Sequence, residues 1–134
     1  MRALDTNVLV RYLTADDPRQ TQAVDRLFEA CERSGEQLFL SILVLCETVW
    51  VLIRCYQQTK STIIEALEQI LEAGLFVVEK DDLARRSIED YRGGKGDFAD
   101  YVIGNLAHAA GCSATVTFDR TLAGAREFTL LASK

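Results

Sequence analysis

Short apolar runs along the chain alternate with longer segments in which apolar residues recur at spacings of three and four. This pattern predicts strands that alternate with helices. The predicted strands cover residues 1–5, 38–40, 75–78, 114–117 and 128–131. Because the alternation continues throughout the chain, we predict an α/β fold with three α/β/α layers and a small parallel sheet of four to five strands.

The helices are predicted from the same spacing and from capping residues at their ends. Ser41 suits the N-cap of a strongly apolar helix, and Asp97 suits the N-cap of a helix that Gly111 stops. Thr62 and Glu65 stand at the spacing of a capping box, which favours a helix that begins at Thr62. The predicted helices cover residues 8–13, 21–33, 42–56, 62–73, 81–92 and 98–110.

The length of 134 residues predicts one domain, which spans residues 1–134. The composition is 49% hydrophobic and 26% charged, which is typical of a compact globular chain rather than a disordered one. The net charge of −5 argues mildly against non-specific binding to nucleic acid, which normally requires a basic surface. Carboxylates gathered in one pocket would be neutralised by a bound metal, however, so the net charge does not decide the partner.

The cysteines and the apolar segments indicate the compartment. The four cysteines include no Cys-x-x-Cys pair, and there is one histidine, so we expect no zinc site. The chain opens without a secretory signal, and we therefore expect reduced thiols and a cytoplasmic protein. The apolar run at residues 42–53 contains Glu47 and is shorter than the roughly 20 residues of a membrane span, so it predicts a buried helix and no membrane association.

Five carboxylates stand where an α/β fold would bring them together. The carboxyl ends of parallel strands form one edge of the sheet, and Asp5 and Asp119 each end a predicted strand. Glu47 lies two turns into the helix that follows the second strand. Asp97 and Asp100 share one face of the first turn of their helix. The sequence therefore predicts one acidic pocket.

The physical argument is strongest at Glu47, which is the one charged residue within 41–53. A carboxylate in apolar surroundings is costly unless it is paired or binds a metal. The alternative is that Glu47 faces solvent along a narrow stripe or pairs with Arg54. Asp97 can serve as a helix cap alone, whereas Asp100 has no expected capping role and is the better metal ligand.

Asp5 and Asp119, taken singly, can be ordinary turn residues, so the joint placement of the acids carries the prediction. Oxygen ligands without histidine or cysteine select hard cations, which here means Mg²⁺ or Mn²⁺. Crowded carboxylates repel one another in the absence of a metal. We therefore expect one or two divalent ions at this site.

Four segments resemble the motifs of the PIN-domain family, in the same order and over nearly the whole chain. They are Asp-Thr-Asn-Val-Leu-Val-Arg at residues 5–11, Glu47 in its apolar helix, Asp-Phe-Ala-Asp-Tyr-Val-Ile-Gly at 97–104, and Thr-Val-Thr-Phe-Asp at 115–119. The size of the chain and its lack of appended domains are similar to those of VapC-type ribonuclease toxins of type II toxin–antitoxin pairs.

This resemblance implies a Mg²⁺-dependent endoribonuclease that hydrolyses phosphodiester bonds of RNA, is inhibited by a cognate antitoxin and forms a homodimer. The implied catalytic and metal-binding acids are Asp5, Glu47, Asp100 and Asp119, with Asp97 as an accessory metal ligand. The residues implied to orient these ligands are Thr6, Asn7 and Thr117. Gly104 departs from the family, which often has alanine in this helix, and we expect it to loosen the packing slightly.

Two other classes of function are compatible with parts of this pattern. A phosphoacceptor receiver domain is also α/β and rich in Asp, but it needs paired acids after the first strand and a lysine after a late strand. Here Asp5 stands alone and the chain has no lysine between Leu131 and its terminus. A non-catalytic binding or scaffold protein on the same fold is the second alternative, and the retained acids argue against it.

Basic and apolar residues near the predicted site suggest roles in binding. The Gly-Gly-Lys-Gly segment at residues 93–96 lacks the pattern of a phosphate-binding loop and is expected to be a flexible loop near the pocket. The basic residues that can hold flanking phosphates are Arg11, Arg92, Lys95 and Arg120. The apolar residues in excess of a small core are Tyr12, Trp50, Leu52, Ile53 and Tyr56, and some of them can form a dimer or antitoxin surface.

Overall fold

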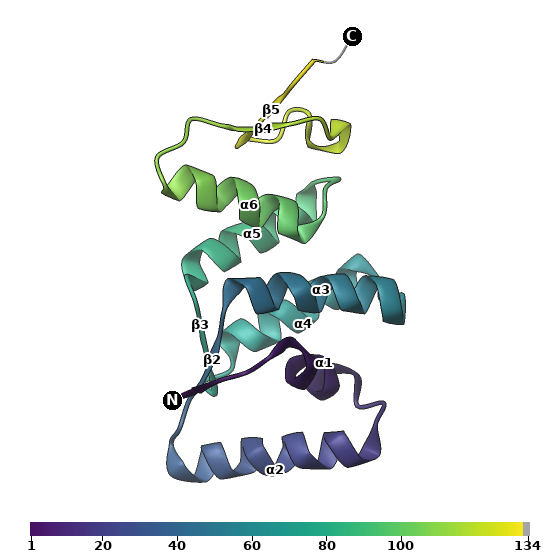
Figure 1. Ribbon diagram of the computed structural model, residues 1–134, viewed down its shortest axis with the longest axis vertical. Helices are drawn as coiled ribbons and strands as arrows, with labels where there is room; N and C mark the ends of the chain where they lie inside the picture. The colour runs from purple at the N-terminus through teal and green to yellow at the C-terminus, as the bar shows by residue number, and fades with distance from the viewer. Residues whose placement is uncertain (133–134) are drawn as a thin grey trace. The chain divides into compact units, whose positions relative to one another are not determined.

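The computed structural model describes residues 1–132, which form two compact units that meet in sequence at Asp81 and Asp82 (Figure 1). Strands and helices alternate in both units, as the sequence pattern predicts. The elements of the first unit are β1 (Arg2–Ala3), α1 (Thr6–Thr14), α2 (Pro18–Ser34), β2 (Leu38–Leu40), α3 (Ile42–Tyr56), α4 (Lys60–Glu72) and β3 (Phe76–Val78). The elements of the second unit are α5 (Asp81–Gly93), α6 (Phe98–Ala109), β4 (Thr115–Thr117), the 3-10 helix η1 (Arg120–Leu122) and β5 (Phe128–Leu130).

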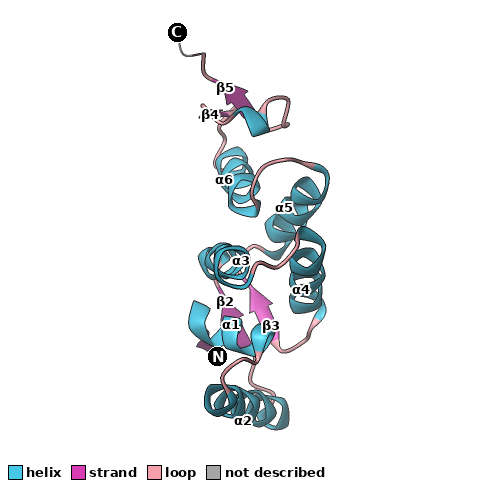
Figure 2. Cartoon of the chain, turned by 90° about the vertical axis from the view of Figure 1, so that its right-hand side faces the viewer, coloured by secondary structure: helices cyan, strands magenta, loops and turns pink. Residues whose placement is uncertain are grey.

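The first unit contains a parallel sheet in the order β1-β2-β3. Phe39 of β2 lies between Ala3 and Val77 in register, and Figure 2 shows β2 and β3 side by side. Leu38 and Leu40 are fully buried because alternate residues of β2 point into the core. Each crossover between parallel neighbours contains helices, as parallel pairing requires.

The helices of the first unit pack through a continuous apolar core. Helix α1 packs against both α2 and α3, and α4 packs against β3. An aromatic cluster joins three of these elements: the ring of Phe28 lies 4.9 Å from that of Tyr12 and 5.7 Å from that of Phe76. The fully buried side chains of the helices in this unit include Leu9, Cys31, Leu45, Leu52, Ile63 and Ile70.

The helix starts are set by side-chain caps. Ser41 caps α3 as predicted, because its hydroxyl accepts a hydrogen bond from the backbone N–H of Val44 at 3.1 Å. The prediction that α4 begins at Thr62 is wrong. Thr59 is its N-cap and accepts from the Thr62 N–H at 3.3 Å, so the helix starts two residues earlier, at Lys60. Likewise, Asp17 caps α2 and advances its start from the predicted Thr21 to Pro18.

The second unit pairs β4 with β5 in parallel, with Thr115 opposite Phe128. Helix α6 packs against β4. The rings of Tyr91 and Phe98 meet edge to face at 6.0 Å, and this contact joins α5 to α6. All five predicted strands are therefore present and parallel, hydrogen-bonded as a set of three and a set of two.

Helix α3 differs from the buried helix that its apolar sequence predicts. Leu45, Val49 and Leu52 are buried, whereas Leu43 is 66% exposed and Trp50 is 59% exposed. The helix therefore has an exposed apolar face as well as a buried one. No helix within residues 1–132 is long and apolar enough to cross a membrane. The cysteines are all free, as expected, and their burial ranges from buried Cys31 to exposed Cys112.

Candidate functional site

Asp5 lies at the carboxyl end of the first strand. The backbone N–H of Leu4 still donates to the Phe39 carbonyl at 3.0 Å, so pairing with β2 continues up to the residue before Asp5. Asp5 is then the N-cap of α1, and its Oδ1 accepts from the backbone N–H of Thr6 at 2.7 Å. The carboxylate is thus fixed at the amino end of a helix, where the helix dipole favours negative charge.

Thr6 connects Asp5 to Glu47. The Thr6 side chain is buried, and its hydroxyl donates to Oε1 of Glu47 at 2.9 Å. Thr6 thus contacts one carboxylate through its backbone and another through its side chain, which supports its predicted orienting role. We call Asp5, Thr6 and Glu47 the first acidic group. Asn7, the other predicted orienting residue of this segment, is exposed and has no hydrogen bond to either acid among residues 1–132.

The burial argument for Glu47 is wrong, because its side chain is exposed on α3. The helix turns Glu47 to the same face as Leu43 and Trp50, and Thr6 rather than a buried metal or counter-ion holds its carboxylate. Arg54 does not pair with Glu47 in the described part of the chain; its guanidinium lies over the Trp50 ring at 5.8 Å.

Asp97, Asp100 and Asp119 form a second acidic group, which lies within the second unit. Asp97 is the N-cap of α6, as predicted. Its backbone N–H donates to Oδ2 of Asp100 at 2.9 Å. The expectation that Asp100 has no capping role is therefore wrong: it supplies the returning half of a capping box. This bond also fixes the direction of its carboxylate and leaves Oδ1 for other partners.

Asp119 stands between β4 and η1 and is held by two threonines. Its Oδ1 accepts from the backbone N–H of Thr121 at 2.9 Å and from the Thr121 hydroxyl at 2.6 Å. Its own N–H donates to Oγ1 of Thr117 at 3.0 Å, which supports the predicted orienting role of Thr117. The sequence analysis did not identify Thr121, although an Asp side chain often accepts a hydrogen bond from the backbone N–H two residues later.

The electrostatics of the second acidic group push two pKa values in opposite directions. Burial raises the pKa of Asp100, and the negative charges of Asp97 and Asp119 raise it further, against the hydrogen bond from the Asp97 N–H. The side-chain and backbone hydrogen bonds from Thr121 lower the pKa of Asp119. Asp119 is therefore the more readily ionised carboxylate, and Asp100 is the better proton acceptor.

The glycine-rich segment beside this group contacts α6 through Gly96, and its flexibility stays a prediction. The backbone N–H of Gly96 donates to the Tyr101 hydroxyl at 2.9 Å. A Cβ at Gly96 would lie 2.6 Å from Leu122 Cδ2 and 3.3 Å from Oδ2 of Asp100, so a larger residue there would require the Leu122 side chain to move. The close approach brings the backbone of this segment against the second acidic group.

The chemistry of both acidic groups suits a hard divalent cation, since every donor is a carboxylate or hydroxyl oxygen. In the first group, Oε2 of Glu47 is unengaged within residues 1–132, and in the second group Oδ2 of Asp119 is unengaged within the same range. Among these residues, no three His, Cys, Asp or Glu side chains are arranged to hold a metal ion. The five acids remain predicted ligands.

The predicted basic residues divide into two kinds. Arg11 pairs with Asp16 and donates to Gln20 at 2.7 Å, and Arg92 pairs with Glu89 at 3.2 Å. Lys95 and Arg120 are exposed and have no ion-pair partner in the described residues. Lys95 stands within the glycine-rich segment at residues 93–96, and Arg120 directly follows Asp119 in sequence. They are therefore the cations available to a phosphate near the second acidic group.

Comparison with known proteins agrees with the motifs carried by the two acidic groups. The model of the PIN domain matches residues 2–127, which include all five acids. A VapC ribonuclease of Aquifex aeolicus (strain VF5) is 32% identical over 120 residues, which cover 90% of this chain and 88% of that protein. The predicted α/β/α fold class is confirmed by this match. The chain belongs to the PIN-domain family, as a VapC-type PIN protein.

Proposed function

We propose that this chain is a Mg²⁺-dependent endoribonuclease and the toxin of a toxin–antitoxin pair, with Mn²⁺ as an alternative ion. The observation that carries the proposal is the double role of Thr6, which directs Asp5 and Glu47 at the end of the first strand. The similarity to a VapC ribonuclease supports the choice of RNA as substrate. The proposed catalytic acids are Asp5, Glu47, Asp100 and Asp119.

The proposed chemistry is hydrolysis of a phosphodiester bond by water. When bound to these acids, with Asp97 as an accessory ligand, Mg²⁺ would acidify a water molecule and offset the charge that develops on the phosphate. Asp119 stays ionised because Thr121 stabilises its carboxylate, so it serves as an anionic ligand. Asp100 would accept a proton of the attacking water on Oδ1, since Oδ2 accepts from the Asp97 N–H. As the new P–O bond forms, the P–O bond to the leaving oxygen would break, and that oxygen would take up a proton from solvent.

The proposed partners are the RNA, a cognate antitoxin and a second copy of the chain. Lys95 and Arg120 hold phosphates that flank the cleaved bond, because both cations are exposed and without ion-pair partners among residues 1–132. The exposed face of α3 supports binding of a protein, because Leu43 and Trp50 place two large apolar side chains in solvent.

The test is a cleavage assay with protein freed from any co-purifying antitoxin. Total RNA is incubated with Mg²⁺ or with EDTA, and the products of the wild type, Asp5→Asn and Asp25→Asn are compared. Asp25 is an exposed acid of α2 outside both acidic groups and serves as the matched control. We expect Mg²⁺-dependent products from the wild type and Asp25→Asn only. Identical products from Asp5→Asn would contradict the proposal and favour a non-catalytic scaffold.

A further inference from the structure

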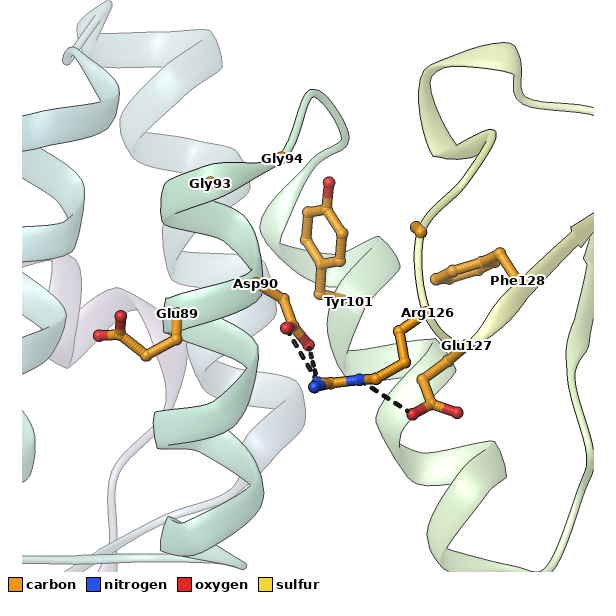
Figure 3. Close-up of a pocket in the computed structure, with 9 residues that line it drawn as sticks. Glu89, Asp90, Gly93, Gly94, Tyr101, Arg126, Glu127 and Phe128 are labelled. Carbon is orange, nitrogen blue, oxygen red and sulfur yellow. Dashed lines mark hydrogen bonds and ion pairs between the residues drawn. The ribbon is translucent and has the colours of Figure 1, made fainter.

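A cavity of about 300 Å³ lies within the second unit, between the end of α5, the first turns of α6 and the segment that leads into β5 (Figure 3). It is open to solvent and is connected to the second acidic group through Gly96, whose N–H donates to the hydroxyl of Tyr101 in the cavity wall and whose Cα carries no Cβ, the position of which would lie 3.3 Å from Oδ2 of Asp100. Its main lining side chains are Glu89, Asp90, Tyr101, Arg126, Glu127 and Phe128.

The charges around this cavity compensate one another. Arg126 donates from Nη2 to both oxygens of Asp90, at 3.0 and 3.2 Å, and its Nε lies 3.2 Å from Oε1 of Glu127. Glu127 is nine-tenths buried and is also approached by Arg86 at 3.3 Å and by His108 at 3.2 Å. Because the acids already have cationic partners, the cavity favours a neutral polar ligand over a second cation or a free phosphate.

Two aromatic rings give the cavity rigid apolar walls. The Tyr101 hydroxyl accepts from the Gly96 N–H, which fixes its ring. The Phe128 ring rests on Gly104 of α6, where a Cβ would lie only 2.7 Å from Phe128 Cε2. Fixed aromatic surfaces are what proteins use to stack planar heterocycles. The volume is sufficient for one such ring system.

The polar rim of the cavity is rich in hydrogen-bond acceptors. Glu89 is exposed, and its Oε1 lies 3.2 Å from Nη2 of the surface residue Arg92. Asp90 accepts from Arg126 and from Asn105 Nδ2 at 3.0 Å, with oxygen lone pairs to spare. Carboxylates recognise the exocyclic amino groups of bases. Adenine, cytosine and guanine carry such a group and uracil does not.

We propose that this cavity receives one unpaired nucleobase of the RNA next to the cleaved bond and prefers a base with an amino group. The inference rests on the proposed function, because it places a base of the substrate beside Asp100. The base stacks on the half-buried ring of Phe128, while the buried ring of Tyr101 forms part of the cavity wall, and the acceptors of Glu89 and Asp90 select the amino group. The cavity thereby contributes to the choice of cleavage site.

Binding is tested without catalysis, by titrating isotopically labelled protein in EDTA with AMP, CMP, GMP or UMP and following the aromatic ring signals by NMR. We expect the signals of Tyr101 and Phe128 to shift with at least one of AMP, CMP and GMP, and less with UMP. Phe128→Leu should lose the response, and Phe128→Tyr should retain it. A response to N-acetylarginine amide but to no nucleotide would overturn the proposal and indicate a site for a protein side chain.

Selectivity is tested by cleavage of RNA with a randomised loop, with the cut sites mapped for the wild type and both Phe128 variants. We expect the wild type and Phe128→Tyr to disfavour uracil at one position, and Phe128→Leu to weaken this preference about tenfold while still cutting. An unchanged preference in Phe128→Leu, with native folding checked by thermal denaturation, would refute the base site. Absence of cleavage by the wild type would instead count against the proposed nuclease function, and the titration would then decide the base site alone.

Discussion

The hydroxyl of Thr6 donates a 2.9 Å hydrogen bond to Oε1 of Glu47, which lies 41 positions further along the chain. The bond ties the first turn of α1 to the middle of α3, two helices that pack against each other. It also orients a carboxylate that is otherwise exposed to solvent. A single buried threonine therefore sets the direction of both acids in the first acidic group.

Thr6→Val should damage both stability and the proposed activity. Valine has the shape of threonine but cannot donate to Glu47, and a hydrogen bond to a charged group contributes about 1.5–3 kcal/mol. We expect a loss of this size in the free energy of unfolding, measured by urea denaturation, and a drop of at least about tenfold in Mg²⁺-dependent cleavage. Thr6→Ser keeps the hydroxyl and should retain most of the cleavage. Equal cleavage by the valine and serine variants would contradict this role.

Asp100→Asn should stabilise the metal-free protein at neutral pH and abolish cleavage. Burial and the charges of Asp97 and Asp119 raise the folded-state pKa of Asp100, so its ionised form opposes folding once the pH exceeds the unfolded-state value near 3.8. Asparagine removes the charge and can still accept from the Asp97 N–H. In EDTA, we expect a higher Tm than the wild type at pH 7 and no difference below pH 3. A lower Tm at pH 7 would show that the carboxylate itself stabilises the helix start.

Asp16→Asn should have the opposite effect on stability. A hydrogen bond from the Tyr56 hydroxyl, at 2.7 Å, is the main cause that lowers the pKa of Asp16, and bonds from Thr14 and Arg11 add to it. A lowered pKa means that the stabilisation is present above the unfolded-state value near 3.8 and is lost as the pH falls further. Thermal melts should show a lower Tm for the variant at pH 7 and convergence with the wild type near pH 2. The exposed-acid variant Asp25→Asn should match the wild type at both values, and an equal loss in that variant would rule out the local explanation.

Lys95→Ala and Arg120→Ala should weaken RNA binding in a salt-dependent way. Removing one side-chain cation that contacts a phosphate reduces the magnitude of the slope of log affinity against log salt concentration by about 0.7 for a single strand. The expected result is a shallower slope for each variant, measured by fluorescence anisotropy with a labelled RNA in EDTA. Arg26→Ala removes an exposed arginine of α2 and is the matched control. Slopes that match those of the wild type and Arg26→Ala would mean that neither cation contacts a phosphate.

The order and type of the elements could be predicted because they depend on local pattern. Short apolar strands, amphipathic helices and the caps Ser41 and Asp97 are all visible within a few residues of sequence. The start of α4 was placed wrongly because Thr59 and Thr62 are equally good caps by residue type, and only the bond from Thr62 N–H to Thr59 decides between them.

The site could be predicted in its residues but only partly in its contacts. The apolar neighbours of Glu47 suggested burial, whereas the helix turns this residue to an exposed face. Arg126, which precedes β5, forms an ion pair with Asp90 of α5. No sequence pattern links two residues that stand 36 positions apart. The cavity could not be predicted from the sequence for the same reason, because its walls come from three segments that only the tertiary fold brings together.

Gly104 and Phe128 form a matched pair, since the ring occupies the space that a Cβ at position 104 would need. The glycine therefore tightens this contact, contrary to the looser packing expected from the sequence. A larger side chain at position 104 alone would clash with the ring, and a smaller side chain at position 128 alone would leave a void. The two positions should therefore change together among relatives. Relatives with alanine at the position of Gly104 should carry a side chain smaller than phenylalanine at the position of Phe128. The loss of that ring would remove one wall of the cavity. Under the proposed base site, we therefore expect relatives with alanine at this position to differ from this chain in the base that they prefer beside the cleaved bond.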